Sequence, residues 1–315
     1  MPDPAPHEIR LLADERARAR RAREWATADR IKAELAAAGW KVIDAGTMYS
    51  LERLPPTVVE VDGELAYGAS EAVPSRLGEA AAAPVTVVLV ADDVAGLLPG
   101  AVAALRTGSP EGQVVVVANA PSEAVAAELA GLSGEVEVLR LAPRLGAAAA
   151  RNAGVRRAAG RVVVLLDPRV EVGGEVVARL AAALGDAEVG VAGIRGLATD
   201  DLVRFAAAPA GAARVVAVDG LAMAFRRADY VARGPLDEHF TLEAFLDAWW
   251  SLILRDVPED AGDAAGPRDA LVVDARYALR GAARPEADER LVKKHRYRFL
   301  RSFAARRDLL LSEQR

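Results

Sequence analysis

The sequence predicts an α/β protein with a mostly parallel sheet covered by helices on both faces, preceded by a small helical module. Three observations predict this class: short apolar runs from position 84 onward, helical segments between them, and an arginine-rich stretch before position 40. Strands buried on both faces appear as unbroken apolar runs, and parallel strands need crossover connections that are usually helices. A chain of 315 residues has room for one large and one small domain.

Four apolar runs are predicted to be neighbouring strands of this sheet. Their Val-rich composition and their length are typical of buried strands. The strands are expected at 85–90, 113–117, 136–141 and 161–166, and helices between them at 96–106, 122–132 and 146–159. Ligands of such sheets bind beyond the carboxyl ends of the strands, so the polar residues that follow each run are the candidate site.

The N-terminal module is predicted to be a helical hairpin followed by a small β-hairpin. An apolar stripe with helical spacing runs through 7–38 and ends at Gly39, with a break expected at Thr27–Asp29. Strands are expected at 41–44 and 49–51.

The expected domain limits follow from these patterns. Residues 54–83 contain Pro55, Pro56, Pro74 and a run of alanines, which predicts a partly ordered linker. The predicted organisation is therefore a module at 1–53, a linker at 54–83 and an α/β domain at 84–315.

Composition excludes several classes of protein. The net charge of −5 implies no global attraction to nucleic acid or membranes. The absence of cysteine excludes a disulfide scaffold, thiolate zinc sites and a cysteine nucleophile. No apolar run approaches the roughly 18–20 residues that a spanning helix needs, and no signal pattern opens the chain. A soluble cytoplasmic protein is therefore expected.

The N-terminal module has its own resemblance. Leu12 to Leu35, followed by Gly39-Trp40 and Val42-Ile43-Asp44, resembles the C-terminal helical segment of cysteinyl-tRNA synthetases. The resemblance covers only about the first 50 residues and implies no synthetase activity. One interpretation is contact with RNA or a protein partner through residues 7–50, by way of the first helix's arginines. The other is a helical hairpin with a solvated charged face.

The α/β region resembles the family 2 glycosyltransferases of the GT-A fold. The segment from Gly146 through Arg151-Asn152 and Gly154 to Asp167 is similar to the core motif of that family in order and spacing. Further on, Gly220 to Arg227 and then Gly234 to Phe240 resemble a second family segment. The resemblance implies inverting transfer of a sugar from a nucleotide diphosphate-sugar to an acceptor hydroxyl.

The resemblance also implies residues that hold the donor. Asp92 and Asn119, at the ends of the first two strands, would grip the nucleoside. Asn119 stands where the family usually has an acidic residue, and its amide both donates and accepts hydrogen bonds. Arg151 and Asn152 either contact the diphosphate or brace the loop that carries Asp167.

The metal motif departs from the family pattern. The family commonly uses Asp-X-Asp to bind Mg²⁺ or Mn²⁺, and this chain has Asp167-Pro168-Arg169. Asp167 remains a candidate metal ligand, whereas a guanidinium has no lone pair to offer a metal. Arg169 is instead predicted to pair with a diphosphate oxygen, with weak or absent metal dependence. The alternative is a decayed site in which Arg169 is merely exposed.

The catalytic base is predicted to be Asp247. It aligns with the Asp of the family's Glu-Asp pair, while Leu246 replaces the Glu. Glu243, four residues earlier on the same helical face, is the reserve candidate. Asp237 and Glu238 are interpreted as acceptor-side or loop-organising residues.

Other polar and aromatic residues are weaker candidates. His239 and His295 are not expected to be catalytic, and of Trp249 and Trp250 at least one is expected in the core. A basic amphipathic helix at 286–311 either packs on the sheet or approaches an anionic lipid surface or a phosphorylated acceptor.

The sequence thus favours a glycosyltransferase that uses a nucleotide-sugar donor and an unknown acceptor. The first alternative is a catalytically degenerate domain that binds a nucleotide or sugar or acts as a scaffold. The second is an RNA-associated factor acting through the N-terminal module.

Overall fold

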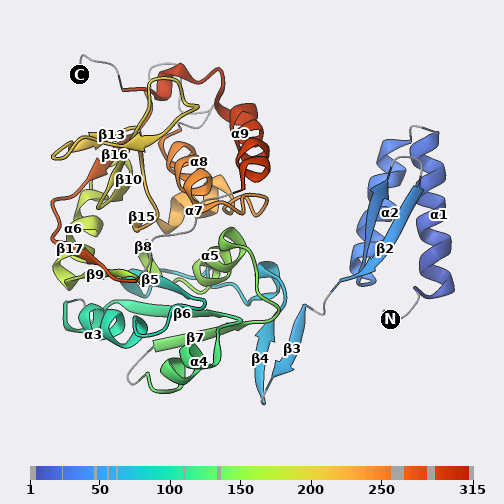
Figure 1. The fold of residues 1–315 in the computed structure, drawn as a ribbon, viewed down its shortest axis with the longest axis horizontal. Coiled ribbons are helices and arrows are strands. Elements are labelled where there is room, and N and C mark those ends of the chain that lie inside the picture. Colours follow the sequence, from blue (N-terminus) through green and yellow to red (C-terminus); the bar gives the residue numbers. More distant parts are fainter. Residues whose placement is uncertain are drawn as a thin grey trace. The chain divides into compact units, whose positions relative to one another are not determined.

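The computed structural model describes residues 5–22, 24–45, 48–54, 57–61, 63–108, 111–132, 136–256, 266–281 and 288–311. The chain forms two compact units, Met1–Val59 and Glu60–Arg315 (Figure 1). Each unit is described by itself.

The smaller unit is a helical hairpin followed by a β-hairpin, as the sequence predicts. Its elements are α1 (His7–Arg21), α2 (Trp25–Ala37), β1 (Trp40–Ala45) and β2 (Met48–Arg53). Its buried core consists of Ala13, Ile31, Leu35 and Val42. Gly39 follows α2 with a φ of 80°, the left-handed conformation that glycine adopts without strain.

The break between the two helices lies earlier than predicted. Thr27 and Asp29 are inside α2, and the chain turns between Arg21 and Trp25. The apolar stripe explains the difference, because Ala28 is buried together with Ile31 and Leu35 and belongs to the same helical face.

The larger unit is built on a sheet of ten strands in the order β13-β16-β10-β15-β8-β5-β6-β7-β4-β3. The central strands β8, β5, β6, β7 and β4 run parallel, and β15 joins β8 antiparallel. The strands are β3 (Val58–Val61), β4 (Glu64–Tyr67), β5 (Ala83–Ala91), β6 (Gln113–Asn119), β7 (Val136–Leu141), β8 (Gly160–Leu166), β10 (Val189–Gly193), β13 (Arg214–Val215), β15 (Ala222–Arg226) and β16 (Asp269–Val272). The fold class is the one that the sequence predicts.

Smaller ladders flank the main sheet. One joins β11 (Gly196–Ala198) to β12 (Ala206–Ala207) and β14 (Ala217–Val218), and another pairs β9 (Val170–Val172) with β17 (Tyr277–Leu279). The second ladder matters for the site, because β9 begins directly after Arg169 and β17 leads into Arg280.

The predicted linker at 54–83 is wrong for much of its length. Strands β3 and β4 lie within it, followed by a short 3₁₀ helix, Ser70–Ala72. Ala66 and Tyr67 of β4 pair with Arg140 and Leu141 of β7, so this segment extends the sheet. The prolines and alanines of this segment suggested a linker. The segment also contains four β-branched residues within 57–61 and a turn glycine, Gly63, whose φ is 79°.

Helices cover both faces of the sheet. One buried cluster involves α5, α7, α8 and α9, and the other involves α3, α4 and α6. Strand β5 serves both, because Val88 belongs to the first cluster and Val87 and Leu89 to the second, as the alternation of side chains along a strand requires. The helices are α3 (Leu98–Gly108), α4 (Glu123–Ala130), α5 (Ala147–Arg156), α6 (Gly174–Ala183), α7 (Arg227–Arg233), α8 (Glu243–Arg255) and α9 (Glu289–Phe303).

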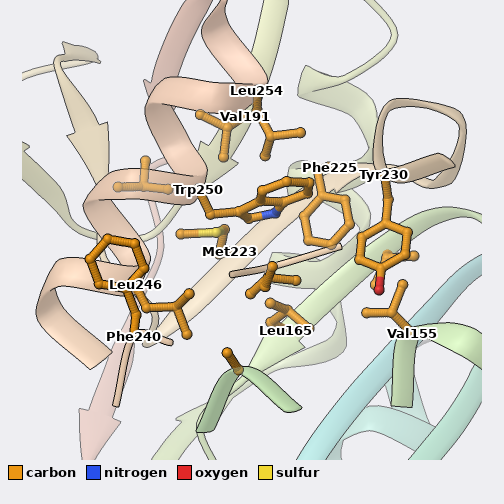
Figure 2. Packing of buried hydrophobic residues seen from close by; sticks show 14 of the residues in the cluster. Val155, Leu165, Val191, Met223, Phe225, Tyr230, Phe240, Leu246, Trp250 and Leu254 are labelled. Carbon is orange, nitrogen blue, oxygen red and sulfur yellow. The ribbon is translucent and has the colours of Figure 1, made fainter. Parts of the chain in front are cut away.

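The core beneath α8 is aromatic. Figure 2 shows the indole of Trp250 directed from α8 toward Met223 and Phe225 of β15. The rings of Phe225 and Tyr230 each meet Trp250 edge to face, with centroids 5.6 and 5.8 Å apart. This packing fixes α8 against the sheet and so fixes the acidic residues on its first turns.

Helix α5 lies unusually close to the sheet. A Cβ atom at Gly154 would meet the Val88 side chain at 2.4 Å, and one at Gly160 would meet the backbone of Thr86 at 2.4 Å. Only glycine permits this approach. Gly154 therefore seats α5, which carries Arg151, against β5 and β6, whereas Gly160 permits the close approach of β8 to β5.

The C-terminal helix α9 has a buried face formed by His295, Phe299 and Phe303, so it packs on the larger unit as one interpretation predicted. Asp288 caps it by accepting hydrogen bonds from the backbone amides of Arg290 and Leu291. Within the described residues, no helix combines the length and apolar character needed to cross a membrane.

Candidate functional site

A cavity of about 460 Å³ opens where the central parallel strands end. Its polar walls come from six segments: the ends of β5, β6 and β8, the loop before α5, and the helices α5 and α8. The charged and amide side chains that line it are Asp92, Asn119, Arg144, Arg151, Asp167, Arg169 and Glu243. The sequence prediction that the site lies at this rim, with Asp92, Asn119, Arg151, Asp167 and Arg169 together, agrees with this geometry.

Asp92 and Asn119 are joined to each other in the cavity wall. The Asn119 amide nitrogen donates to Asp92 Oδ1 at 2.9 Å and to the Leu145 carbonyl at 3.0 Å. Its oxygen accepts from the Leu145 amide at 2.8 Å. Asn119 therefore holds Asp92 and the loop before α5 in place.

The cavity walls also change the acidity of Asp92. Although the residue as a whole is exposed, burial of its carboxyl group raises its pKa above the ordinary value. The hydrogen bond from Asn119 and the charge of Arg144 act in the opposite direction without cancelling this effect.

Arg144 is a cavity residue that the sequence reasoning missed. It forms a forked ion pair with Asp93 and donates to the Ala120 carbonyl at 3.0 Å. The available signal was its position, since it stands between the end of the strand 136–141 and the first motif glycine, Gly146.

Asp167 and Arg169 form an ion pair within a single tight turn after β8. Arg169 Nη2 donates to Asp167 Oδ2 at 2.5 Å, and Nε lies 3.0 Å from Oδ1. The Arg169 backbone amide also donates to Oδ1, at 2.9 Å. This hydrogen bonding raises the pKa of Arg169 further above its ordinary value, so its charge is permanent.

A second ion pair joins distant parts of the chain. Arg151 Nη1 on α5 donates to Asp247 Oδ1 on α8 at 2.6 Å, and the Gly220 amide donates to Oδ2 at 2.8 Å. The side chains of Arg151 and Asp247 are only 8% and 4% exposed. A Cβ atom at Gly220 would lie 2.5 Å from Asp247 Oδ1, so glycine is required for this contact.

Glu243, the reserve candidate, lies one helical turn before Asp247. Its side chain is 28% exposed, and its Oε1 is 4.0 Å from Arg151 Nη2. Glu243 lines the cavity already described, whereas Asp247 lines a neighbouring one. The two carboxylates of α8 therefore face different spaces.

The neighbouring cavity, of about 500 Å³, shares Arg169 and Gly220 with the first. Its other charged residues are Arg195, Asp219, Asp247 and Arg280. Arg195 pairs with Asp219, and burial raises the pKa of the Asp219 carboxyl above its ordinary value. The sequence analysis did not identify Arg195, Asp219 or Arg280 as site residues. For Arg195 and Arg280, neither a predicted strand end nor a family motif indicated a role.

Asn152 is a brace that lies outside both cavities. It is 1% exposed, donates to the Leu236 carbonyl and to Glu238, and accepts from Tyr230 and the Leu236 amide. These hydrogen bonds brace the loop of Leu236 and Glu238, whereas the bracing interpretation named the loop that carries Asp167.

Asp237 and Glu238 hold their loop in place. Glu238 accepts from Ser70 and Asn152, and Asp237 pairs with Arg298 of α9. Neither residue lines the two cavities. Their placement supports the loop-organising interpretation and not an acceptor-side contact.

The histidines and tryptophans lie away from the chemistry. His239 bonds to Asp237 at the surface, and His295 is buried beside Phe240, where burial lowers its pKa. Trp250 is fully buried, in agreement with the expectation that at least one tryptophan is core.

Comparison with known proteins gives two separate results. A stretch of 47 residues is 47% identical to a cysteine–tRNA ligase from Opitutus terrae, a match that covers 15% of this chain and 10% of that protein. The match agrees with the N-terminal resemblance. A contact of residues 7–50 with RNA or a protein partner stays a prediction.

The larger unit matches glycosyltransferases. A structure of GalNAc-T7 with UDP, GalNAc and Mn²⁺ is similar with a TM-score of 0.56 and 17% identity, over 71% of this chain and 49% of that one. A mannosyltransferase of Pyrobaculum calidifontis, in complex with GDP-Man and Mn²⁺, aligns with a TM-score of 0.47 and 18% identity, over 64% and 58% of the two chains. This chain thus spans about half the length of GalNAc-T7. Residues 86–214 match the model of glycosyl transferase family 2, and the larger unit has a GT-A fold.

Proposed function

We propose that the larger unit transfers a sugar, with inversion, from a nucleotide diphosphate-sugar to an acceptor hydroxyl. The observation that carries this proposal is the cavity at the strand ends, which is lined by the paired Asp92 and Asn119 and by Arg169. The family match of residues 86–214 supports the same reaction class.

The donor would occupy the first cavity. Asp92, held by Asn119, offers carboxylate oxygens to N–H or O–H groups of the nucleoside. The diphosphate would then extend toward Arg169, where a fixed positive charge stabilises the charge that develops on the leaving group.

The acceptor would enter the second cavity. Its hydroxyl oxygen attacks the anomeric carbon from the face opposite the diphosphate, while the carbon–oxygen bond to the diphosphate breaks. Asp247 lines this cavity and would accept the hydroxyl proton, and the nucleoside diphosphate leaves with the bonding electron pair. Arg151 and the Gly220 amide would hold the Asp247 carboxylate in position.

The first test measures nucleoside diphosphate release from a panel of UDP- and GDP-sugars. Asp247→Asn is expected to lower turnover by about 10²–10⁴-fold, because it removes general base catalysis. Glu243→Gln is the matched variant on the same helix and is expected to have a smaller effect. Thermal unfolding of both variants checks that each is folded. A larger loss in Glu243→Gln than in Asp247→Asn would assign the base to Glu243.

A nucleotide-sugar binder without turnover is the second candidate. It is favoured by the ion pairs that engage both Asp167 and Asp247. Donor binding to the wild-type protein, with no release of nucleotide from any donor, would support this candidate over the transferase.

A further inference from the structure

Arg169 occupies the junction of the two cavities. It lines both of them, and its side chain is 15% exposed. The ladder of β9 and β17 holds its backbone, since the Arg280 amide donates to the Arg169 carbonyl at 2.8 Å. The guanidinium is therefore held where a donor in the first cavity would meet an acceptor in the second.

The residues around this junction do not fit a divalent metal ion. Mg²⁺ and Mn²⁺ prefer several oxygen ligands, yet both oxygens of Asp167 accept hydrogen bonds from Arg169. Across the described part of the chain, no three His, Asp or Glu side chains gather as a metal ion would require. Arg169 itself has no lone pair with which to bind a metal.

Arg169 balances the negative charge of the carboxylates that line the first cavity. Three arginines and three carboxylates line that cavity. Without Arg169 the carboxylates would be in excess, and a diphosphate would be repelled. An arginine in place of a carboxylate changes the local charge by two units, the same change that one bound divalent cation makes.

We propose that Arg169 is a built-in cation that binds the diphosphate of the donor and takes the place of a divalent metal ion. This inference rests on the proposed nucleotide-sugar function. A planar guanidinium can hold one anion while it offers further N–H groups to a second. Asp167 then serves to orient Arg169 toward the diphosphate and not to bind a metal.

Calorimetric titration with UDP, GDP and inorganic pyrophosphate tests this inference. Each titration is run with EDTA and, separately, with Mn²⁺. The variants are Arg169→Gln, which removes the charge with little change in size, and Arg169→Asp, which restores a second carboxylate. Arg214→Ala is the matched control, because Arg214 is also ion-paired but lies outside both cavities.

For the wild-type protein, affinity for the nucleotide that binds is expected to be the same with EDTA and with Mn²⁺. Arg169→Gln is expected to weaken binding by about 10- to 100-fold, the usual worth of a charge-assisted hydrogen bond. Arg169→Asp is expected to bind weakly with EDTA and to recover with Mn²⁺, with a Mn²⁺ signal in electron paramagnetic resonance that the wild-type protein lacks. Arg214→Ala is expected to match the wild type.

Two results would overturn the inference alone: loss of wild-type binding in EDTA, or unchanged affinity in Arg169→Gln. Absence of binding to all three ligands under both conditions would instead overturn the proposed function together with this inference, so the two failures are distinguishable.

Discussion

The two ion pairs of the site each join an arginine to an aspartate, but one lies within a single turn and the other connects two helices. Asp167 and Arg169 are two residues apart and share one turn; both line the first cavity, and Arg169 also lines the second. Arg151 and Asp247 are 96 residues apart, join α5 to α8, and are also tied to the backbone of Gly220. A local pair can exchange partners without moving the fold, whereas the distant pair holds two helices together.

We therefore expect the Asp167–Arg169 pair to affect ligand binding and the Arg151–Asp247 pair to affect the stability of the fold. Separating a buried pair leaves a charge without compensation in a medium that solvates it poorly. The Asp167–Arg169 pair is nearly as buried, with side chains 6% and 15% exposed, but it lies within one turn and joins no distant elements.

The largest effect is expected from removing the buried cation. Arg151→Ala should lower the free energy of unfolding by about 3–5 kcal/mol, because Asp247 then lacks its partner while only 4% exposed. Arg169→Ala should cost less, because Asp167 keeps the hydrogen bond from the backbone amide of residue 169 and its pair joins no distant elements. Urea unfolding of both variants measures the difference. Equal losses of the free energy of unfolding in the two variants would show that the two pairs contribute equally to stability, against this prediction.

A smaller effect is expected from filling the space beside Asp247. Gly220→Ala should cost about 1–3 kcal/mol, because the added Cβ would press on both Asp247 oxygens, which lie 2.5 and 2.6 Å from its position. Gly100→Ala on α3 is the control, since nothing lies within 4 Å of a Cβ there. That control should be neutral or slightly stabilising. A Gly220→Ala protein as stable as Gly100→Ala would contradict the close contact.

The smallest effect concerns the contribution of Asp92 to the pH dependence of stability. Burial raises the pKa of Asp92, so its protonated form stabilises the folded state, and this contribution is lost as pH rises through the folded pKa. Asp92→Asn should therefore be slightly more stable than the wild type at neutral pH and lose this advantage below about pH 4. Thermal unfolding across that range checks the sign. A variant less stable than the wild type at neutral pH would contradict it.

Much of the fold could be predicted from the sequence because its signals are local. The runs at 113–117, 136–141 and 161–166 all lie within observed strands, since continuous β-branched residues have few other stable uses. The strands β3 and β4 were missed because prolines and alanines around them resemble a linker. Their place in the sheet depends on pairing with β7, which no local pattern reveals.

The candidate site divides in the same way. Asp92, Asn119, Asp167 and Arg169 follow strands directly, so the rule for parallel sheets places them together. Arg195, Asp219 and Arg280 come from later segments, and only the folded chain brings them to the second cavity. The pairing of Arg151 with Asp247 was also missed, because it depends on how α8 packs against α5.

The most direct test of the account is a crystal structure of the protein with UDP or GDP, grown in the presence of EDTA. We expect the nucleoside beside Asp92 and the diphosphate within hydrogen-bond distance of the Arg169 guanidinium. A nucleotide bound elsewhere, or a diphosphate that points away from Arg169, would contradict it.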